Sequence, residues 1–368
     1  MTSIQAAVFR APGVPFTVET LELSPPLAGE VQVRVRAVGV CHSDWHLMTG
    51  ATSHPVPVVP GHEGAGVVEA VGPGVTTVKV GDHVALNWAP NCGHCFYCLH
   101  AKPSLCAEYL ESIWAGVLLD GTTRLHLNGE PVFHFSALAA FAERTVVPEA
   151  CCVRMPEEVP FEIAAVIGCA VTTGVGSVLN TAKVAPGSSV AVLGAGGVGL
   201  STIMAARLAG AYPVIAIDTS AEKLEFARSL GATHGFLSGP GLLAEVRNLC
   251  GGRGPDYAFE AVGIPALQEQ CLELIRPGGV AVLSGISPMG SGTNLPGALI
   301  TRQEKTVMGS YYGTSSSARD FPLYAQMYLS GQLPLDRLVT RRYPLEQINE
   351  AYADLIGGLP GRGVIVFP

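Results

Sequence analysis

The sequence predicts a two-domain protein that combines a β-barrel domain with an α/β domain built on a doubly wound parallel sheet. Its 368 residues exceed what one hydrophobic core usually organises, so two cores are expected. Short segments of period-two hydrophobicity fill the N-terminal part, which is typical of half-buried β-strands. After Val147, strand-like and helix-like segments alternate, which indicates a parallel sheet with helices on both faces.

Composition and charge narrow the class of protein. Hydrophobic residues make up 48% of the chain and charged residues 14%, so there is ample apolar surface for two cores. The net charge of −8 disfavours binding of a polyanion, and we therefore expect no nucleic-acid partner. The N-terminus lacks a basic region before an apolar run, and no uninterrupted apolar stretch approaches about eighteen residues. We therefore expect a cytoplasmic protein without a membrane partner, whose ten cysteines serve as metal ligands and free thiols.

The barrel domain is predicted from alternating segments near the N-terminus. In GEVQVRVRAVGV, Val31, Val33 and Val35 alternate with polar residues, which indicates a strand with one buried face. The same texture resumes in GAGVVEAVGPGV and VGDHVAL, and ERTVVPEACCVRMP supplies the last strands of this domain. These strands favour a closed or partly closed antiparallel barrel.

The stretch CHSDWHLMTGATSHPVPVVPGHE gathers the residue types of a catalytic zinc site. Its thiolate, imidazoles, hydroxyl and carboxylates come from Cys41, His46, His62, Ser43, Asp44 and Glu63. A catalytic zinc takes sulfur and nitrogen ligands, keeps one position open for substrate, and has hydrogen-bonding groups behind the ligands. Cys41 and His62 need a third ligand from elsewhere. Cys169, in VIGCAVTTG, is the candidate because it lies just before a dinucleotide-binding motif.

A second metal site is predicted in CGHCFYCLHAKPSLC. Its cysteines, at spacings of three, three and eight residues, are Cys92, Cys95, Cys98 and Cys106. Four thiolates can enclose one ion tetrahedrally and leave no position for substrate, so this site is predicted to be structural. From about Ala107 to Phe141 we expect a long irregular surface lobe with turns at DGTTR and NGEP.

The α/β domain follows a predicted helix, FEIAAVIGCAVTTGVGSVLNTAKV, that crosses from one domain into the other. SSVAVLGAGGVGL then supplies a strand, a turn and the start of a helix. PDYAFEAVG, GGVAVLSGI and TVMGSYY supply further strands, enough for a six-stranded sheet. From about Thr314 two more helical segments and a final strand, RGVIVFP, complete the chain.

The glycine-rich turn of this domain predicts a dinucleotide cofactor. It follows an apolar strand, opens a helix, and comprises Gly194, Gly196, Gly197, Val198 and Gly199. Glycines there permit close backbone approach to a pyrophosphate, and the helix N-terminus offers N–H groups to the anion. Asp218, 19 residues beyond Gly199, can accept hydrogen bonds from the adenosine ribose and would repel a 2′-phosphate, so NAD is favoured over NADP. Lys223 is either a second ribose contact or a solvated helix lysine.

Together these motifs resemble the zinc-containing medium-chain alcohol dehydrogenases, and the resemblance covers essentially the whole chain. It implies a GroES-like β-barrel as the catalytic domain and a Rossmann fold for the coenzyme. The implied boundaries are 1–170 for the catalytic domain, 171–313 for the coenzyme domain and 314–368 for a C-terminal segment that returns to the barrel. Relatives with a full lobe are often dimers, so a homodimer is expected, with a tetramer as the alternative.

The resemblance implies roles around two Zn²⁺ ions. Cys41, His62 and Cys169 would bind a catalytic zinc, and the four clustered cysteines a structural one. Asp44 would hydrogen-bond His62 and fix its tautomer, and Glu63 would lie behind the catalytic zinc.

The resemblance also implies roles toward the coenzyme and the alcohol. Ser43 would take the alcohol proton, which a relay through the nicotinamide ribose would pass to His46 and solvent. Thr173 would contact the nicotinamide, and Arg362 the pyrophosphate. Two aromatic residues match positions that line the substrate pocket and favour an apolar or aromatic primary alcohol, with core packing as the alternative: Trp88 and Phe135.

Two departures from the family pattern bear on the function. His42 stands where many relatives place an arginine against the pyrophosphate, and imidazole carries at most a partial charge at neutral pH. The glutathione-dependent formaldehyde dehydrogenases of the family share the chain's layout. However, their thiol-binding arginine falls at Leu110, and their carboxylates fall within 49–53, which has none. Glutathione is therefore disfavoured as a partner.

The leading hypothesis is an NAD-dependent zinc alcohol dehydrogenase. One alternative is a dehydrogenase of formaldehyde adducts with another low-molecular-weight thiol. Another is a relative that keeps its nicotinamide bound and exchanges hydride with a second carbonyl compound. A zinc-ribbon module for nucleic acid is disfavoured by the acidic net charge and by the lack of interleaved basic and aromatic residues around the four cysteines.

Overall fold

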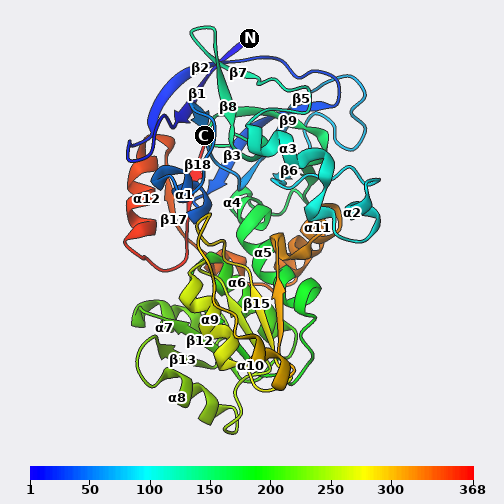
Figure 1. The fold of residues 1–368 in the computed structure, drawn as a ribbon. Helices are drawn as coiled ribbons and strands as arrows, with labels where there is room; N and C mark the ends of the chain where they lie inside the picture. Colours follow the sequence, from blue (N-terminus) through cyan, green and yellow to red (C-terminus); the bar gives the residue numbers. More distant parts are fainter.

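A computed structural model describes all residues 1–368 and shows two bodies joined by a long helical segment (Figure 1). The strands form three sheets, of five, seven and six strands. They are β1 Thr2–Val8, β2 Thr17–Leu23, β3 Glu30–Gly39, β4 Val58–Val59, β5 Gly64–Val71, β6 His83–Leu86, β7 Leu125–Leu127, β8 Glu130–His134, β9 Arg144–Pro148, β10 Cys152–Arg154, β11 Val190–Leu193, β12 Val214–Asp218, β13 His234–Leu237, β14 Tyr257–Glu260, β15 Val280–Leu283, β16 Thr306–Gly309, β17 Val339–Tyr343 and β18 Arg362–Val366.

The helices lie mainly in the second body and in the C-terminal segment. The α-helices are α1 His42–Thr49, α2 Phe96–Leu99, α3 Ala107–Ala115, α4 Phe161–Val166, α5 Thr172–Gly176, α6 Gly197–Leu208, α7 Ala221–Ser229, α8 Leu242–Leu249, α9 Pro265–Leu274, α10 Gly297–Arg302, α11 Ser317–Leu329 and α12 Ile348–Ile356. Two π-helical turns span Ile167–Val171 and Ser177–Ala182. Short 3₁₀ turns span Pro103–Leu105, Phe135–Ala137, Glu149–Cys151, Tyr312–Thr314, Leu335–Arg337 and Leu345–Gln347.

Strand β3 organises the β-rich body. Val31, Val33 and Val35 are buried along it, as their alternation predicts. The seven-stranded sheet has the order β10-β6-β5-β3-β18-β17, with β9 also paired to β3, and the five-stranded sheet has the order β1-β2-β7-β8-β4. Because β18 pairs with β3, the C-terminal strand lies within the body formed by the N-terminal residues (Figure 1).

The second body is the predicted parallel sheet. Its order is β13-β12-β11-β14-β15-β16, and every neighbouring pair is parallel. The chain moves outward from β11 in one direction through β12 and in the other through β14, which leaves a crevice at the carboxyl end of β11 where ligands bind in such folds. The predicted combination of a β-domain and a doubly wound α/β domain is confirmed.

The predicted crossing helix is one continuous helical segment, Phe161 to Ala182, which runs through α4, α5 and the two π turns. It is the one helix long and apolar enough to cross a membrane, but 89% of its apolar window is buried inside the protein, so it is a core helix. Thr172, Thr173 and Ser177 interrupt its apolar run, which is why the sequence showed no uninterrupted stretch of that length.

The lobe between Ala107 and Phe141 is more regular than the sequence predicts. It contains helix α3 and the hairpin β7–β8, and β7 pairs with β2 of the five-stranded sheet. Tyr109 and Ile113, four residues apart on α3, are its buried side chains, and they anchor the helix to the β-domain core. The expectation of an irregular stretch is wrong, because a helix with only two buried side chains leaves little periodicity in the sequence.

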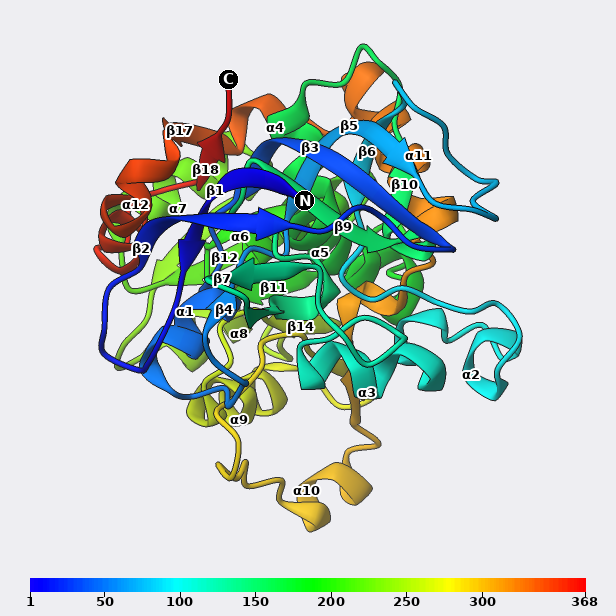
Figure 2. The ribbon, with the colours of Figure 1, turned by 90° about the horizontal axis from the view of Figure 1, so that it is seen from above.

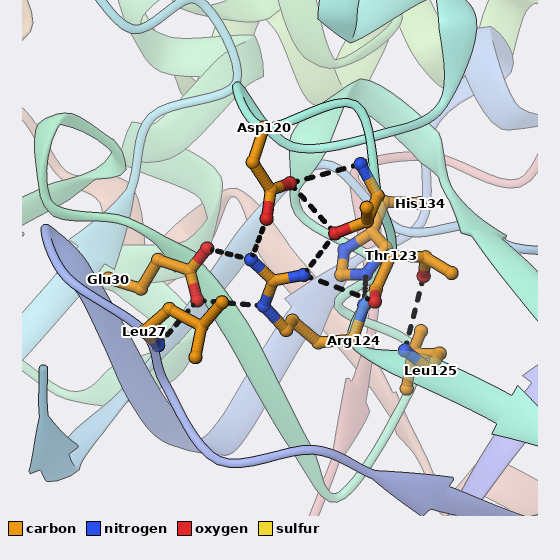
Figure 3. Close-up of polar contacts among 8 residues, drawn as sticks. Leu27, Glu30, Asp120, Thr123, Arg124, Leu125 and His134 are labelled. Atoms are coloured by element: carbon orange, nitrogen blue, oxygen red, sulfur yellow. Dashed lines mark hydrogen bonds and ion pairs between the residues drawn. The ribbon is translucent and has the colours of Figure 1, made fainter.

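A buried arginine ties the lobe to β3 (Figure 3). The guanidinium of Arg124 donates two hydrogen bonds to Glu30, from Nε at 2.9 Å and from Nη2 at 2.5 Å, and a third to Asp120 at 2.6 Å. The Arg124 and Glu30 side chains are only 5% and 9% exposed. This network fixes the loop before β7 against the start of β3.

Candidate active site

The register of β3 and β5 brings the first two predicted zinc ligands together. Val38 of β3 faces Gly64 of β5, and the Gly39 N–H donates to the Glu63 carbonyl at 2.9 Å. Cys41 follows the end of β3, and His62 precedes the start of β5. The sheet therefore places both side chains at the same edge.

Cys169 reaches this edge from the helical segment. It lies in the π turn Ile167–Val171, which follows α4, and α4 packs on β3 and β5. The ligand atoms of Cys41, His62, Glu63 and Cys169 all lie within 4.8 Å of one another, and all four residues are buried. π-Helical turns often occur at functional sites, and this one delivers a buried thiol to the group.

The donor set of this group fits a metal ion. Asp44 lies behind His62, with Oδ2 3.1 Å from Nδ1, and its Oδ1 accepts a hydrogen bond from the Gly61 N–H at 2.9 Å. The other ring nitrogen, Nε2, is buried without a hydrogen-bond partner, which leaves a lone pair free for a metal. Two thiols and one imidazole then offer a three-ligand set of the kind found in catalytic zinc sites.

The electrostatics of the two thiols differ. A hydrogen bond from Cys169 holds the pKa of the Cys41 thiol well below its usual range, burial opposes this effect, and the neighbouring His62 and Arg362 side chains support it. The same hydrogen bond and burial hold the pKa of Cys169 well above its usual range. Thiolate character is therefore concentrated at Cys41, and thiolate is the form that binds metals.

Glu63 pairs with a residue from the far end of the chain. Its Oε1 accepts a hydrogen bond from Nη2 of Arg362, and both side chains are almost completely buried, at 0% and 3% exposure. Burial raises the pKa of Glu63, and the guanidinium of Arg362 opposes that shift. Arg362 also lies against the glycine turn, since a Cβ on Gly197 would come within 2.5 Å of its Cδ. Its Nε has no hydrogen-bond partner, so it can still donate to an anion.

Helix α1 presents two faces to the site. Asp44 and Leu47 point inward and are buried, while Ser43 and His46, three residues apart, line a cavity together with His42. The Ser43 Oγ lies 3.8 Å from the Cys41 Sγ. Desolvation lowers the pKa of His42, and the neighbouring Cys41 opposes that shift, so the imidazole is largely neutral at neutral pH.

One cavity joins the proposed metal-binding residues to the glycine-rich turn. It has a volume of about 710 Å³ and extends from Cys41 and Cys169 to the glycine turn. The predicted site residues that line it are Cys41, His42, Ser43, His46, Trp88, Cys169, Thr173, Gly194, Gly196, Gly197, Val198, Asp218, Lys223 and Arg362. His62, Asp44 and Glu63 lie buried behind this wall, and so does Gly199.

The glycine turn has the shape that a dinucleotide requires. A Cβ on Gly199 would lie 1.7 Å from the Gly194 carbonyl oxygen, so only glycine permits this packing of helix against turn. A Cβ on Gly196 would meet nothing within 4 Å, so the cavity stays open above that backbone. At the end of β12, Asp218 accepts one backbone hydrogen bond on each oxygen, from Ala195 at 2.8 Å and from Ser220 at 3.0 Å. Each oxygen keeps a further lone pair that a ribose hydroxyl can use.

The two predicted pocket aromatics have different positions. Trp88 lines the cavity and stands edge-on to the His62 ring, with centroids 6.4 Å apart. Phe135 does not line it: the ring is 4% exposed and is packed against His54 and His62, at centroid distances of 5.4 and 5.8 Å. Phe135 therefore packs behind the imidazole, and its role in the substrate pocket stays a prediction.

Sequence reasoning missed part of the cavity wall. Two of the missed groups come from the cysteine loop and from the end of β16, and they are Lys102, Ser104, Leu105, Ser310, Tyr311, Tyr312 and Thr314. A usable signal existed for the second group, since residues that follow the carboxyl end of a parallel strand line the ligand crevice. The cysteine loop carried no comparable signal.

The four clustered cysteines form a separate group within the lobe. Their Sγ atoms are 3.5 Å apart for Cys95 and Cys98, and 3.9 Å for both Cys92–Cys98 and Cys95–Cys106. A zinc ion with bonds of about 2.3 Å to four sulfurs requires sulfur–sulfur distances of about 3.8 Å, so the spacing fits. Hydrogen bonds from the Cys98 and Ala107 N–H groups lower the pKa of Cys95 to about 6, which favours the thiolate. All ten cysteines are free, so no disulfide competes with metal binding.

A buried group of two thiols and an imidazole that shares a cavity with a glycine turn defines the class of zinc-binding dehydrogenases. Residues 27–157 match the family described as Alcohol dehydrogenase GroES-like domain, and residues 197–329 match the family described as Zinc-binding dehydrogenase. The chain therefore belongs to the zinc-containing medium-chain alcohol dehydrogenases, as its motifs predicted.

Individual relatives agree with this assignment. The NDMA-dependent alcohol dehydrogenase of Amycolatopsis methanolica is 40% identical over 98% of both chains. The crystal structure of an alcohol dehydrogenase zinc-binding domain protein from Burkholderia ambifaria has a TM-score of 0.95 at 38% identity and covers 100% of this chain and 99% of that one. The benzyl alcohol dehydrogenase of Acinetobacter calcoaceticus has a TM-score of 0.95 at 32% identity and covers 100% of both chains. These relatives support alcohol dehydrogenase activity.

Proposed function

We propose that the protein is an NAD-dependent zinc alcohol dehydrogenase that interconverts an apolar or aromatic primary alcohol and its aldehyde. The observation that carries the proposal is the single cavity lined by both Cys41 and Cys169 and by the glycine turn. Two cysteines and one histidine with an open fourth position are the known zinc ligand set of alcohol dehydrogenases. Bound zinc would supply a Lewis acid that lowers the pKa of the alcohol hydroxyl, and bound NAD would supply the hydride acceptor.

The side chains of the chain itself then move the proton and hold the cofactor. Ser43, whose hydroxyl lies beside Cys41, accepts the proton that the alcohol loses. His46 lies one turn further along α1 and lines the same cavity, so it can carry the proton toward solvent. Asp218 would bind the adenosine ribose, and Arg362 the pyrophosphate.

The cavity wall and one relative support the substrate class. Trp88 stands edge-on to Tyr311, at a centroid distance of 5.3 Å, and the two rings give the cavity an aromatic wall. The relative from Acinetobacter acts on benzyl alcohol according to its name. We therefore place aromatic primary alcohols ahead of short aliphatic ones.

The relative from Amycolatopsis favours a second candidate. Its name states dependence on NDMA. By analogy, this chain would retain its nicotinamide through the catalytic cycle and return the hydride to a second substrate. Release of nicotinamide when the purified protein is denatured, together with turnover that requires NDMA, is the result that this candidate predicts.

A panel of alcohols tests the leading proposal. NADH formation from added NAD is measured with aliphatic, allylic and aromatic primary alcohols, and each assay is repeated with formaldehyde plus a low-molecular-weight thiol. We expect turnover of benzyl-type alcohols without thiol. Turnover only with formaldehyde and thiol would contradict the proposed substrate class and identify an adduct dehydrogenase.

Assembly and location form a separate proposal. We propose a cytoplasmic homodimer with no nucleic-acid or membrane partner. A tetramer mass in light scattering would contradict the dimer.

A further inference from the structure

The segment Ser310–Thr314 forms part of the cavity wall, to which its Tyr311 contributes an aromatic ring. It leaves the carboxyl end of β16 and leads to α11. Four of its five residues line the cavity: Ser310, Tyr311, Tyr312 and Thr314. Any ligand that fills the cavity between the glycine turn and Cys169 therefore lies close to this segment.

The backbone of the segment adopts a conformation that side chains rarely allow. Tyr312, Gly313 and Thr314 are three consecutive residues with φ of 54°, 64° and 51°. For residues other than glycine this left-handed region is strained, and such strain persists only where the surrounding structure holds it in place. Strained backbone is concentrated at active sites, and here three sets of contacts hold the strained segment in place.

The first contact joins two glycines. A Cβ on Gly313 would lie 2.4 Å from the Thr172 carbonyl oxygen and 2.7 Å from the Cα of Gly176. A Cβ on Gly176 would in turn lie 2.5 Å from the Gly313 carbonyl oxygen. The segment therefore lies directly on the backbone of α5, which begins just after the π turn that carries Cys169.

A pair of hydroxyl contacts holds the same segment to the second π turn. Thr181 Oγ1 lies 2.9 Å from Ser310 Oγ and 2.8 Å from Thr314 Oγ1. The segment is thus held at its first and last residues to one part of the helix.

The remaining contact comes from Tyr312. Its side chain is 3% exposed, and its hydroxyl donates a hydrogen bond to the carbonyl of Gly168, the residue before Cys169. Its ring lies 4.5 Å from that of Trp88, in the cavity wall. One side chain therefore touches both the substrate side of the cavity and the turn that presents a zinc ligand.

We propose that Tyr312 is a positioning residue for the catalytic metal. Its hydroxyl holds the Gly168 carbonyl and thereby fixes the π turn at the orientation that aims the Cys169 Sγ at Cys41 and His62. This inference rests on the proposed function, in which Cys169 is a zinc ligand. Groups that orient a ligand from behind typically change metal affinity or activity about 10- to 100-fold when they are removed.

The test is Tyr312→Phe, which removes only the hydroxyl. Tyr343→Phe is the matched control, since the Tyr343 hydroxyl also makes one hydrogen bond, to Asp354 Oδ2 at 2.6 Å, but lies outside the cavity. Both variants and the wild type are loaded with Co²⁺, and its absorption spectrum and its loss to a chelator are measured alongside thermal stability. We expect Tyr312→Phe to shift the Co²⁺ absorption bands and to release the catalytic ion at least about tenfold faster. Tyr343→Phe should match the wild type in both.

Two results would overturn the proposal. One is a Tyr312→Phe protein with the wild-type spectrum and rate of metal loss. The other is equal acceleration in both tyrosine variants, which would indicate a general loss of packing. A separate result concerns the metal site itself. If the Cys169→Ser variant has the same metal content as the wild type, Cys169 is not a zinc ligand, and the inference about Tyr312 fails with it. That result is obtained without altering Tyr312, so a failure of the proposed metal site can be distinguished from a failure of the proposed role of Tyr312.

Discussion

Ser43 is the residue of helix α1 whose hydroxyl lines the cavity beside a proposed metal ligand. It lies 3.8 Å from the Cys41 Sγ, and neighbouring Asp44 is turned away into the core. No other hydroxyl on α1 lies as close to Cys41 while lining the cavity. Proton transfer at the alcohol is therefore the step that depends most on one residue.

We expect Ser43→Ala to lower the turnover number at least about tenfold, because general acid–base steps typically contribute about 10²-fold or more. Ser104→Ala is the control, since Ser104 lines the same cavity from the cysteine loop. Turnover is measured with ordinary and deuterated alcohol. Unchanged turnover, with a full isotope effect that shows hydride transfer to be rate-limiting, would remove Ser43 from the mechanism.

At the residue scale, the sequence predicted which residues would gather as proposed zinc ligands, but not all of the packing around them. Cys41, His62 and Cys169 could be found because metal ligation restricts residue type and spacing. The position of Tyr312 could not be predicted, because an aromatic ring has the same signature in a pocket wall and in a core. Only the fold decides which of these an individual ring fills.

At the scale of elements, the Arg124 network joins the lobe to the sheet that carries the active site (Figure 3). Glu30 begins β3, and the far end of β3 leads into Cys41. Asp120 adds a second carboxylate: burial opposes its ionisation, but hydrogen bonds from Arg124 and Thr122 outweigh burial and lower its pKa. Removal of one partner would leave a buried charge with incomplete compensation.

We expect Glu30→Gln to reduce the free energy of unfolding of the β-domain by about 3 kcal/mol, at the lower end for a broken buried pair because Asp120 remains. Glu19→Gln is the control: Glu19 pairs with Arg10 at the surface, where the side chains are 23% and 44% exposed, and we expect a loss below about 1 kcal/mol. Urea unfolding is followed by tryptophan fluorescence, since Trp45, Trp88 and Trp114 all lie in this domain. Equal losses in the two variants would contradict the role of the network.

The predictability of elements depended on their length and period. The parallel sheet was predictable because each buried strand is followed by a helix at regular spacing. Helix α3 was not, because its buried face consists of only Tyr109 and Ile113. Strands β7 and β8, of three and five residues, are held by pairing with β2 and by the turn between them, and such short strands have little periodicity of their own.

At the scale of the whole molecule, the function depends on where the two domains meet. The segment Phe161–Ala182 carries Cys169 and Thr173 into the cavity, and β18 brings Arg362 back from the end of the chain. Seen from above, the segment that carries α10 projects from the rest of the molecule (Figure 2). The sequence indicated both domains and both motifs, but the shared cavity follows from tertiary packing that periodicity does not encode.

Zinc content is the measurement that tests this account most directly. Zinc per chain is determined by atomic emission for the wild type and for Cys169→Ser. The two cysteine-containing groups predict two zinc ions in the wild type and one in Cys169→Ser, with the remaining ion held by the four-cysteine group. A wild-type protein with a single zinc ion, or a Cys169→Ser protein that retains both, would contradict the proposed catalytic metal site.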